Sequence, residues 1–582
     1  MFIKSLTIKN FRCFGKGADE KGTAIELNKG LTAFIGRNGS GKTAILEALN
    51  FLIGSDYLPT RISEKDFNSS AKEIKDVIII GGETERPFFA TIDVRSSTNL
   101  LETVIIPCNK IRLTIKRREK AEKVLDDPFR IEKVAIPVVG DIDQNIYDED
   151  EKARKTTKIS EIKGGYTIYY KLKDGQERNA KVINYQLTYN PNRLKKCPKA
   201  YYLTKDRDDD VSGNYSLIAK VLTDLHWKYK KKQSGSENTI STEYDTLAGS
   251  LRGIVDEKSV LINGINEKVK AICSEDKNFQ IDFIDIDQPY KSAFVAKKEC
   301  EKLLLPDNLG SGFNILIAYA LFAYVADQEK IPIVLIIDEP ELHLHSDWQK
   351  KMYDVFAKQN DLQFVYSTQS ENFISLKNWK QIRAIADFQI FPKEEIIRDQ
   401  VTATDGQTGS RADYLDDYAT KNLHISTILR ENLELFFAKK CILVEGPSDK
   451  YGLLKLLKLF GCDVENYSVS IIPAWGKTKI KNYQMICKVF GIEYFTVFDN
   501  DKATDDEPIN ENAAIENNVQ NEKKTKFSTS FEAKLGVAGD NKFQKLVKKI
   551  DELTDMNSLD QEIKDCANNL KTFIESNNSD SM

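Results

Sequence analysis

The chain has few histidines and no closely paired cysteines, and these shortages remove two classes of site. Four histidines and nine cysteines are scattered over 582 residues, and no two cysteines form a C-x-x-C pair. A zinc site draws on clustered Cys and His, so none is expected. We expect the cysteines to be reduced core thiols, as in a reducing compartment.

Long apolar runs and a large excess of one charge are also missing. No apolar run approaches the roughly 18 residues that a membrane span needs. The first 15 residues alternate polar and apolar positions, a strand pattern that a signal peptide does not have. We therefore expect a cytoplasmic protein without a membrane partner. The net charge of −4 does not indicate nucleic-acid binding, but it is compatible with a local basic groove.

A full phosphate-binding loop pattern is present near the N-terminus. An apolar run from Leu31 leads into the segment GRNGSGKT, and apolar residues follow it at helical spacing. In this strand–loop–helix context, backbone N–H groups surround the phosphates of a nucleotide, a Lys reaches the β- and γ-phosphates, and a Thr ligates Mg²⁺. The sequence thus predicts an ATP and Mg²⁺ site formed by Gly36, Asn38, Gly39, Ser40, Gly41, Lys42 and Thr43.

The other half of a nucleotide site is expected about 300 positions later in the chain. The apolar strand IPIVLIIDEPELHLH ends in Asp338 and Glu339. Asp338 is expected to hold Mg²⁺, and Glu339 to orient the water that attacks the γ-phosphate. Upstream, the loop LGSG brings Ser311 and Gly312 to the start of a long apolar helix, where N–H groups and a hydroxyl can meet an anion.

Between these halves the sequence alternates strand signals with charged segments. Strand-rich runs from Asp76 to Ile136 predict an antiparallel sheet beside the nucleotide site. Residues 137–163 are charged and rich in turn formers, and we expect a surface insertion there. Residues 214–275 are helical in pattern and predict an arm that pairs subunits, the alternative for its basic stretch at 228–232 being contact with DNA.

Acidic turns define a second chemical centre in the C-terminal part. Glu445 ends the strand CILVE, Asp449 follows at a helix start, and Asp499 and Asp501 end the strand EYFTVFDND. Alternate residues at a strand end point to one side, so the two aspartates can face one ion. Several carboxylates at adjacent strand ends form a hard oxygen site for Mg²⁺ or Mn²⁺, and two such ions can stabilise both oxygens of a phosphodiester displacement.

The opening NFRCF, the phosphate-binding loop, the LGSG loop and the segment DEPELHLH together resemble the RecF- and SMC-like branch of ABC-type ATPases. In that family the LGSG loop faces the γ-phosphate held by a second subunit, so the resemblance implies a homodimer or higher homo-oligomer that shares two nucleotides. The family's switch His corresponds here to Gln369, which can bind phosphate but cannot be protonated.

The pair VEGPSD and FDND resembles the TOPRIM domain of topoisomerases, primases and some nucleases. An ATPase followed by TOPRIM resembles the OLD (overcoming lysogenization defect) family of nucleases, which includes the Gabija nuclease. In this family a further acidic residue and a Lys follow, for which Glu532 and Lys542 are the candidates here. The resemblance implies Glu445, Asp449, Asp499, Asp501 and Glu532 as metal ligands and Lys542 as a stabiliser of transition-state charge.

The predicted architecture is α/β, with a P-loop ATPase carrying a helical insert and followed by a Rossmann-like TOPRIM domain. The predicted parts are the N-terminal ATPase half 1–210, the insert 211–278, the C-terminal ATPase half 279–395, a linker 396–435 and the TOPRIM domain 436–582.

Two functions follow from this resemblance. The first is an ATP-binding, metal-dependent DNA endonuclease or nickase of antiviral defence, whose ATPase dimer gates cleavage. It would act alone or with a neighbour-encoded partner such as a helicase, or a retron reverse transcriptase with its msDNA. The alternative is a RecF-like clamp that holds DNA in the presence of ATP and does not cut it.

Overall fold

The structure is a computed structural model, and it describes most of the chain. The described residues are 2–17, 20–54, 58, 61–95, 101–118, 128–148, 153–172, 174–189, 193–205, 260–273, 278–283, 293–299, 302–304, 311–329, 332–359, 362–402, 408–421, 432–500, 507–553 and 558–576. The predicted helical arm at 214–275 lies mostly outside them.

Contacts divide the chain into two compact units. The first comprises Met1–Phe34 and Gly41–Phe373, and the second comprises Ile35–Ser40 and Ile374–Met582. None of the described helices is long and apolar enough to cross a membrane. The seven cysteines described as free are mostly buried, in line with the expectation of core thiols.

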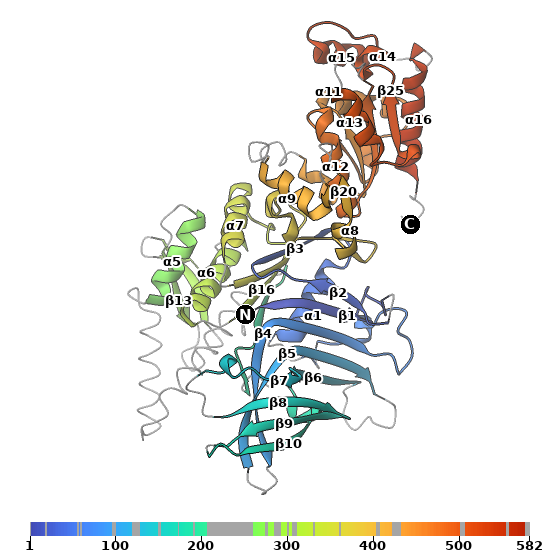
Figure 1. Cartoon of the computed structure of the whole chain (residues 1–582). Coiled ribbons are helices and arrows are strands. Elements are labelled where there is room, and N and C mark those ends of the chain that lie inside the picture. Colours follow the sequence, from blue (N-terminus) through green and yellow to red (C-terminus); the bar gives the residue numbers. More distant parts are fainter. Residues whose placement is uncertain are drawn as a thin grey trace. The chain divides into compact units, whose positions relative to one another are not determined.

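A mixed, mainly antiparallel sheet of ten strands makes up much of the first unit (Figure 1). Its main path runs β10-β9-β8-β5-β4-β1-β2, and β6, β7 and β11 pair with strands of that path. The bounds are β1 Ile3–Lys9, β2 Thr23–Glu26, β4 Ile78–Arg95, β5 Leu101–Arg117, β6 Phe129–Pro137, β7 Gly140–Asp141, β8 Arg154–Ile162, β9 Gly165–Lys171, β10 Glu177–Ile183 and β11 Leu194–Lys195. The predicted antiparallel strands between 76 and 136 are present as β4, β5 and β6.

One sequence interpretation in this region was wrong. Residues 137–163 were predicted to be a surface insertion, but 140–141 and 154–162 are strands of the sheet, where β8 pairs with β5, β7 and β9. Its apolar positions are few, yet Thr156 and Ile159 are buried, and the Thr156 hydroxyl donates to the Ile105 carbonyl at 2.7 Å. The charged residues on its other face gave the segment the composition of a loop.

A parallel sheet carries the nucleotide motifs. Within the first unit its strands lie in the order β12-β16-β17-β3, with β12 at Lys199–Leu203, β16 at Ile333–Asp338, β17 at Leu362–Ser367 and β3 at Leu31–Gly36. Helix α1, Lys42–Ile53, contacts strands of both this sheet and the antiparallel sheet. The motifs at 31–43 and 331–345, far apart in sequence, therefore lie on neighbouring parts of one sheet.

Shorter elements complete the first unit. The helices are α5 Val260–Cys273, α6 Ser311–Glu329 and α7 Ser346–Lys358, and a three-stranded antiparallel sheet consists of β13 Asn278–Phe283, β14 Ala293–Glu299 and β15 Lys302–Leu304. Phe356 of α7 stacks on Phe364 of β17 with ring centroids 4.2 Å apart. This contact fixes α7 against the parallel sheet.

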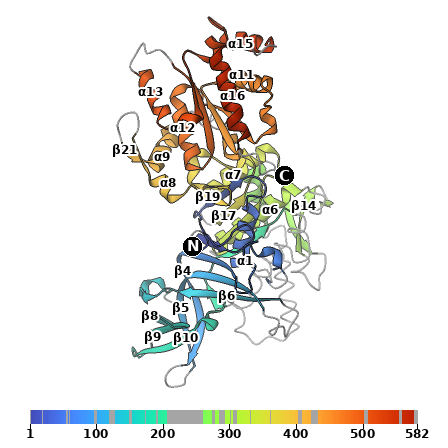
Figure 2. The same cartoon turned by 90° about the vertical axis from the view of Figure 1, so that its right-hand side faces the viewer.

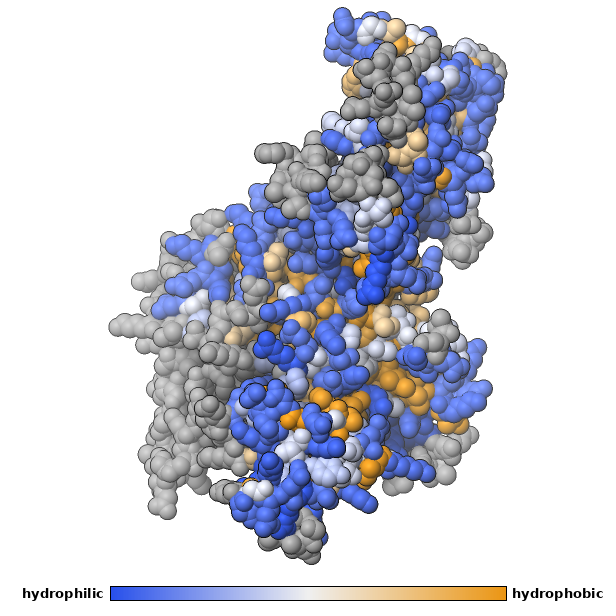
Figure 3. All heavy atoms as spheres, in the orientation of Figure 1, coloured by the Kyte–Doolittle hydropathy of each residue, from blue (hydrophilic) through white to orange (hydrophobic). Residues whose placement is uncertain are grey.

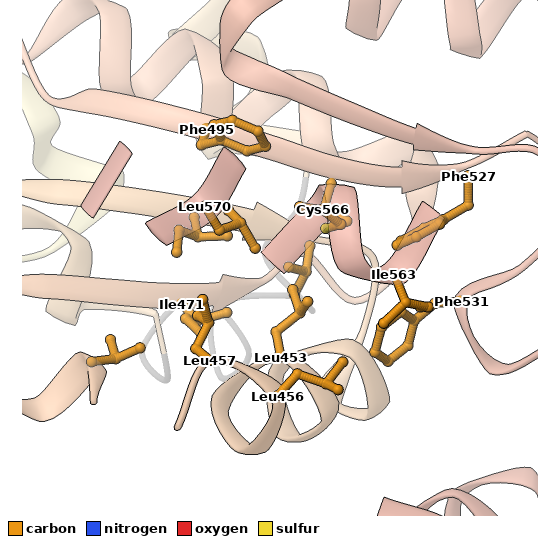
Figure 4. Packing of buried hydrophobic residues seen from close by; sticks show 14 of the residues in the cluster. Leu453, Leu456, Leu457, Ile471, Phe495, Phe527, Phe531, Ile563, Cys566 and Leu570 are labelled. Atoms are coloured by element: carbon orange, nitrogen blue, oxygen red, sulfur yellow. The ribbon is translucent and has the colours of Figure 1, made fainter. Parts of the chain in front are cut away.

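The second unit contains a four-stranded parallel sheet with helices on both faces (Figure 2). The strand order is β23-β22-β24-β25, with bounds Val469–Pro473, Lys440–Val444, Glu493–Asp499 and Lys524–Phe527. The helices are α11 Pro447–Leu459, α12 Lys477–Val489, α13 Glu507–Glu516, α14 Phe531–Lys534, α15 Lys542–Asp551 and α16 Gln561–Glu575. Figure 4 shows its core, where Leu453 and Leu457 of α11 pack with residues of the sheet and of α16.

The segment predicted as a linker contains regular structure of its own. It includes β20 Gln400–Thr402, β21 Thr408–Ser410 and helix α9, Arg411–Lys421; β18 Ile382–Ala386, β19 Gln389–Phe391 and α8 Glu394–Arg398 precede them. Leu415 and Tyr418 of α9 are buried, and the Trp379 indole N–H donates to Asp416 at 3.0 Å. The polar residues that suggested a linker lie on the exposed sides of small helices and strands.

Candidate functional site

The glycines of the phosphate loop adopt backbone angles that other residues rarely adopt. Gly36, Gly39 and Gly41 have φ values of 145°, 79° and 104°, which side-chain-bearing residues rarely adopt. A Cβ at Gly41 would lie 2.7 Å from the Cys13 sulfur. The loop therefore turns tightly into α1, whose first residues are Lys42 and Thr43.

The carboxylate at the end of β16 lies beside this helix start. The Thr43 hydroxyl donates to Asp338 Oδ2 at 3.0 Å, and the Ser367 hydroxyl donates to Asp338 Oδ1. Asp338 is 2% exposed, so these bonds fix a nearly buried carboxylate. A hydroxyl and a carboxylate held together at a phosphate loop are the donor set that fits a nucleotide-bound Mg²⁺.

Glu339 is held by two partners. Its Oε1 atom accepts from the Lys205 ammonium and from the Gln369 amide, both at 2.8 Å. Burial alone would raise the pKa of Glu339, but these hydrogen bonds outweigh it and hold the pKa below its usual value. In this arrangement Glu339 is an ionised carboxylate engaged by a cation, and Gln369, at the switch position, is one of the groups that engage it.

A neighbouring carboxylate fixes the segment after β17. Glu341 accepts from the Gln369 backbone N–H at 2.6 Å and from the Thr368 hydroxyl at 2.9 Å, and burial raises the pKa of Glu341. Burial likewise lowers the pKa of Lys42, an effect that Glu339 and Asp338 oppose. Lys205 and Glu341 were not among the predicted site residues. Glu341 stands in the predicted DEPELHLH motif, whereas no sequence signal marks Lys205.

The predicted signature loop is only partly described. Ser311 and Gly312 are the first two residues of α6, while Leu309 and Gly310 lie outside the described residues. The role of Ser311 and Gly312 toward a nucleotide remains a prediction.

The acidic turns of the second unit meet where the strand order of its sheet reverses. The chain leaves β22 toward β23 on one side and returns to β24 on the other, so the carboxyl ends of β22 and β24 are neighbours. Ligands of open α/β sheets bind at such a switch point. Glu445 follows β22 directly, and Asp499 is the last residue of β24.

Hydrogen bonds lock these carboxylates in position. Glu445 Oε1 accepts from the Asp499 backbone N–H at 2.8 Å, and Asp499 Oδ1 accepts from the Phe531 N–H at 3.0 Å. Asp449 Oδ2 accepts from the Gly446 N–H at 2.8 Å. Phe531 precedes Glu532 in α14, so the contact with Asp499 brings the start of this helix to the two strand ends.

The carboxylates influence one another's protonation. Burial and then repulsion from Glu445, Asp449 and Glu532 raise the pKa of Asp499 to about 8. Burial, together with repulsion from Glu532 and Glu445, raises the pKa of Asp449 to about 7, although the Gly446 hydrogen bond opposes this. Four predicted carboxylates thus share one electrostatic environment that a cation would stabilise.

For two predicted residues the structure describes no link to this group. Asp501 lies outside the described residues. Lys542 is an exposed residue at the start of α15, and no contact of the described residues links it to the four carboxylates. Within the described part of the chain, no three Asp, Glu, His or Cys side chains are arranged to hold an ion. The oxygen donors of these carboxylates suit Mg²⁺ or Mn²⁺ by their chemistry. Their role as metal ligands stays a proposal.

A second turn lies against the first acidic turn. The Ala474 N–H donates to the Val444 carbonyl and the Gly476 N–H to the Glu445 carbonyl, both at 2.8 Å. Trp475, between them, has a φ of 58° and is 40% exposed. Lys477 begins α12, and its ammonium donates to the Asp499 carbonyl. Trp475 was not among the predicted site residues.

Comparison with known families agrees with the predicted order of an ATPase domain and a TOPRIM domain. A family model described as an AAA ATPase domain matches residues 1–374. The chain belongs to this ATPase family. A second model, described as the TOPRIM domain of overcoming lysogenization defect protein-like sequences, matches residues 436–501. The match includes Glu445, Asp449, Asp499 and Asp501, and it ends before Glu532 and Lys542.

The ATPase also has curated relatives. The OLD nuclease of Thermus scotoductus is 23% identical over 540 residues, which is 90% of this chain and 86% of that protein. The chromosome partition protein Smc of Fusobacterium nucleatum is 34% identical over 87 residues, 15% of this chain and 6% of that protein. The DNA double-strand break repair Rad50 ATPase of Methanococcus maripaludis is 42% identical over 53 residues, 9% of this chain and 5% of that protein.

Solved structures include an Smc head bound to the C-winged helix domain of ScpA. It superposes with a TM-score of 0.35 at 13% identity and covers 67% of this chain and 96% of that chain. The predicted combination of a P-loop ATPase with a TOPRIM domain is confirmed by the family matches, and the resemblance to an OLD nuclease extends over 90% of the chain.

Proposed function

We propose that this protein is an ATP-binding, divalent-metal-dependent DNA endonuclease or nickase, in which Glu445, Asp449, Asp499, Asp501 and Glu532 hold the metal ions. The observation that carries the proposal is that Glu445 and the Asp499 backbone are hydrogen-bonded at the switch point of a sheet whose domain matches OLD-like TOPRIM, with Asp449 and Glu532 near enough to raise the pKa of Asp499. A bound divalent cation supplies positive charge at the scissile phosphate. The relative of similar length is named a nuclease.

The residues of this chain have distinct tasks in the proposed reaction. The Asp499 backbone N–H holds one oxygen of Glu445, which fixes the carboxylate at the strand end. The Phe531 N–H does the same for Asp499. Lys477 brings a positive charge to the same strand end and is better situated than Lys542 to meet a DNA phosphate.

The ATPase part is proposed to control cleavage. Lys42, Thr43 and Asp338 would bind MgATP, and Ser311 and Gly312 would meet the nucleotide of a second subunit in a homodimer or larger homo-oligomer. A role in antiviral defence, with a helicase or a reverse transcriptase and its msDNA as partner, belongs to this proposal. The similarity to an OLD nuclease supports the nuclease part of this proposal.

Plasmid nicking tests the nuclease assignment. Supercoiled plasmid is incubated with Mg²⁺ or Mn²⁺ and with wild type, Glu445→Ala or Glu465→Ala. Glu465 is an exposed acidic residue of the same domain and serves as the matched control. We expect Glu445→Ala to lose at least about 100-fold in rate, because loss of a metal ligand removes charge stabilisation worth several kcal/mol. Glu465→Ala should nick like wild type.

The opposite result has a clear meaning. Equal nicking by wild type and Glu445→Ala would remove the carboxylates from the reaction. Retention of DNA in the presence of ATP without cleavage under any metal condition would favour the RecF-like clamp instead.

A further inference from the structure

The turn that carries the exposed Trp475 is hydrogen-bonded to the backbone of the acidic turn. The residues on both sides of Trp475 donate backbone hydrogen bonds to Val444 and Glu445, each at 2.8 Å. Successive Cα atoms are about 3.8 Å apart. The Trp475 backbone is therefore held next to the strand end that bears Glu445.

The fold does not account for an aromatic residue at this position. A φ of 58° is adopted readily by Gly and at a cost by bulky residues. The indole is 40% exposed, and among the described residues no other ring packs against it. A Cβ built at the neighbouring Gly476 would meet no atom within 4 Å, so the space over the turn is open. Turn geometry and burial both disfavour Trp here, which points to a role for the side chain itself.

The charges around the indole suit a nucleic-acid backbone. The Lys477 ammonium donates to the Asp499 carbonyl, and Lys477 is the first residue of α12, a helix of 13 residues. A positive charge thus lies at the strand end that bears Asp499, two residues along the chain from Trp475. The described surface of this domain that faces the viewer in Figure 3 is largely hydrophilic.

We infer that Trp475 stacks on an unpaired DNA base next to the scissile phosphate, while Lys477 contacts the backbone. An aromatic face binds any base without reading its sequence, but bases inside a duplex are already stacked on each other and are not available to it. The preferred substrate class is then DNA with at least one unpaired nucleotide at the cleavage position. This inference rests on the proposed nuclease function and names the substrate of that site.

The test uses glycine as the replacement. Trp475→Gly removes the indole and suits the positive φ, so the variant should fold at least as well as wild type, which a melting curve checks. Phe388→Gly is the matched control, because Phe388 is also an exposed aromatic, at 49%, with a φ of 59°. Trp475→Phe keeps an aromatic ring. Each change is made in the full-length chain.

Binding is measured first, by fluorescence anisotropy with a labelled single-stranded oligonucleotide, in a Glu445→Ala background that prevents cleavage. Stacking on one base is worth about 1–3 kcal/mol, so Trp475→Gly should weaken binding by about 5- to 150-fold. Trp475→Phe should restore most of the affinity, Phe388→Gly should have no effect, and affinity for the fully paired duplex of the same sequence should hardly change.

Cleavage is measured second, on that duplex with and without one unpaired nucleotide. Wild type should prefer the unpaired substrate, and Trp475→Gly should lose the preference through a higher KM. Unchanged single-strand binding by Trp475→Gly would overturn the inference even if the enzyme cuts DNA. If wild type cuts nothing, the nuclease proposal fails, and the binding comparison still decides whether Trp475 stacks on a base.

Discussion

At the scale of single residues, Asp499 is the carboxylate whose protonation most affects the acidic site. Its pKa of about 8 lies far above the usual Asp value of about 3.9, so the folded chain binds a proton here that the unfolded chain releases. Between these two values the folded state binds more protons than the unfolded state. The free energy of unfolding contributed by this group is therefore largest at low pH and decreases as pH rises toward 8.

We therefore predict that the melting temperature of wild type in EDTA falls as the pH is raised from about 5.5 to 8.5, because Asp499 then contributes less to the free energy of unfolding. Asp499→Asn removes the titration and should flatten that dependence, whereas Asp540→Asn, a change at an exposed position of the same domain, should not. Addition of Mg²⁺ at pH 8.5 should raise the melting temperature of wild type more than that of Asp499→Asn. A pH profile identical for wild type and Asp499→Asn would refute the coupling of these carboxylates.

Single residues also show which parts of the two sites could be predicted from the sequence. The glycines, Lys42, Thr43, Asp338 and the strand-end carboxylates could be predicted, because each chemistry demands one residue type at a fixed spacing. Lys205 could not, since its ion pair with Glu339 joins residues 134 positions apart with no local pattern. Trp475 was not predicted, because an exposed aromatic residue in a loop indicates a binding role only when its neighbours in space are known.

At the scale of elements, the docking of α16 depends on a buried lysine. Lys440, at the start of β22, is 2% exposed, and its ammonium donates to the carbonyls of Phe573 and Ser576 and to the Ser576 hydroxyl. These acceptors lie at the C-terminal end of α16, where backbone carbonyls lack helical partners and favour a cation. Burial lowers the pKa of Lys440, so this charge is kept at a cost that the three hydrogen bonds offset.

We predict that Lys440→Met destabilises the chain by about 2–3 kcal/mol, because it removes charged hydrogen bonds and leaves helix-end carbonyls without their donor. Urea unfolding followed by circular dichroism measures the change. The exposed neighbour Lys439 provides the control, and Lys439→Met should stay within about 0.5 kcal/mol of wild type. Equal stability of the two variants would show that α16 docks through its apolar face alone.

Elements were predicted well where hydrophobic period and motif agree, as in β3, α1, β16, β22 and β24. Prediction failed for β8 and for the segment around α9, where half-buried elements carry many charges on their exposed sides. Local composition does not separate such elements from loops, because the pairing partner that buries their other face is distant in sequence.

At the scale of the whole molecule, the proposal couples the nucleotide bound by the ATPase part to DNA cleavage by the TOPRIM domain. A cleavage assay with ATP, with a non-hydrolysable analogue and with no nucleotide tests the proposed gating. We expect the nicking rate to differ between the ATP and the nucleotide-free arms by at least about fivefold, a coupling of about 1 kcal/mol. Lys42→Ala, which disables the phosphate loop, should make the three arms equal. Three equal arms with wild type would contradict gating while leaving the nuclease assignment intact.

The parallel pairing of β3 with β17 also shapes how the chain can be made in a cell. Leu31 pairs with Phe364, so the strand that leads to the phosphate loop meets its neighbour only after the ribosome has added roughly 330 further residues. At about 5–20 residues per second, that interval is about 15 to 70 seconds. During this time Leu31, Ala33, Phe34 and Ile35 lack the neighbouring strand that β3 pairs with in the folded chain, and an unpaired apolar segment of this kind favours aggregation.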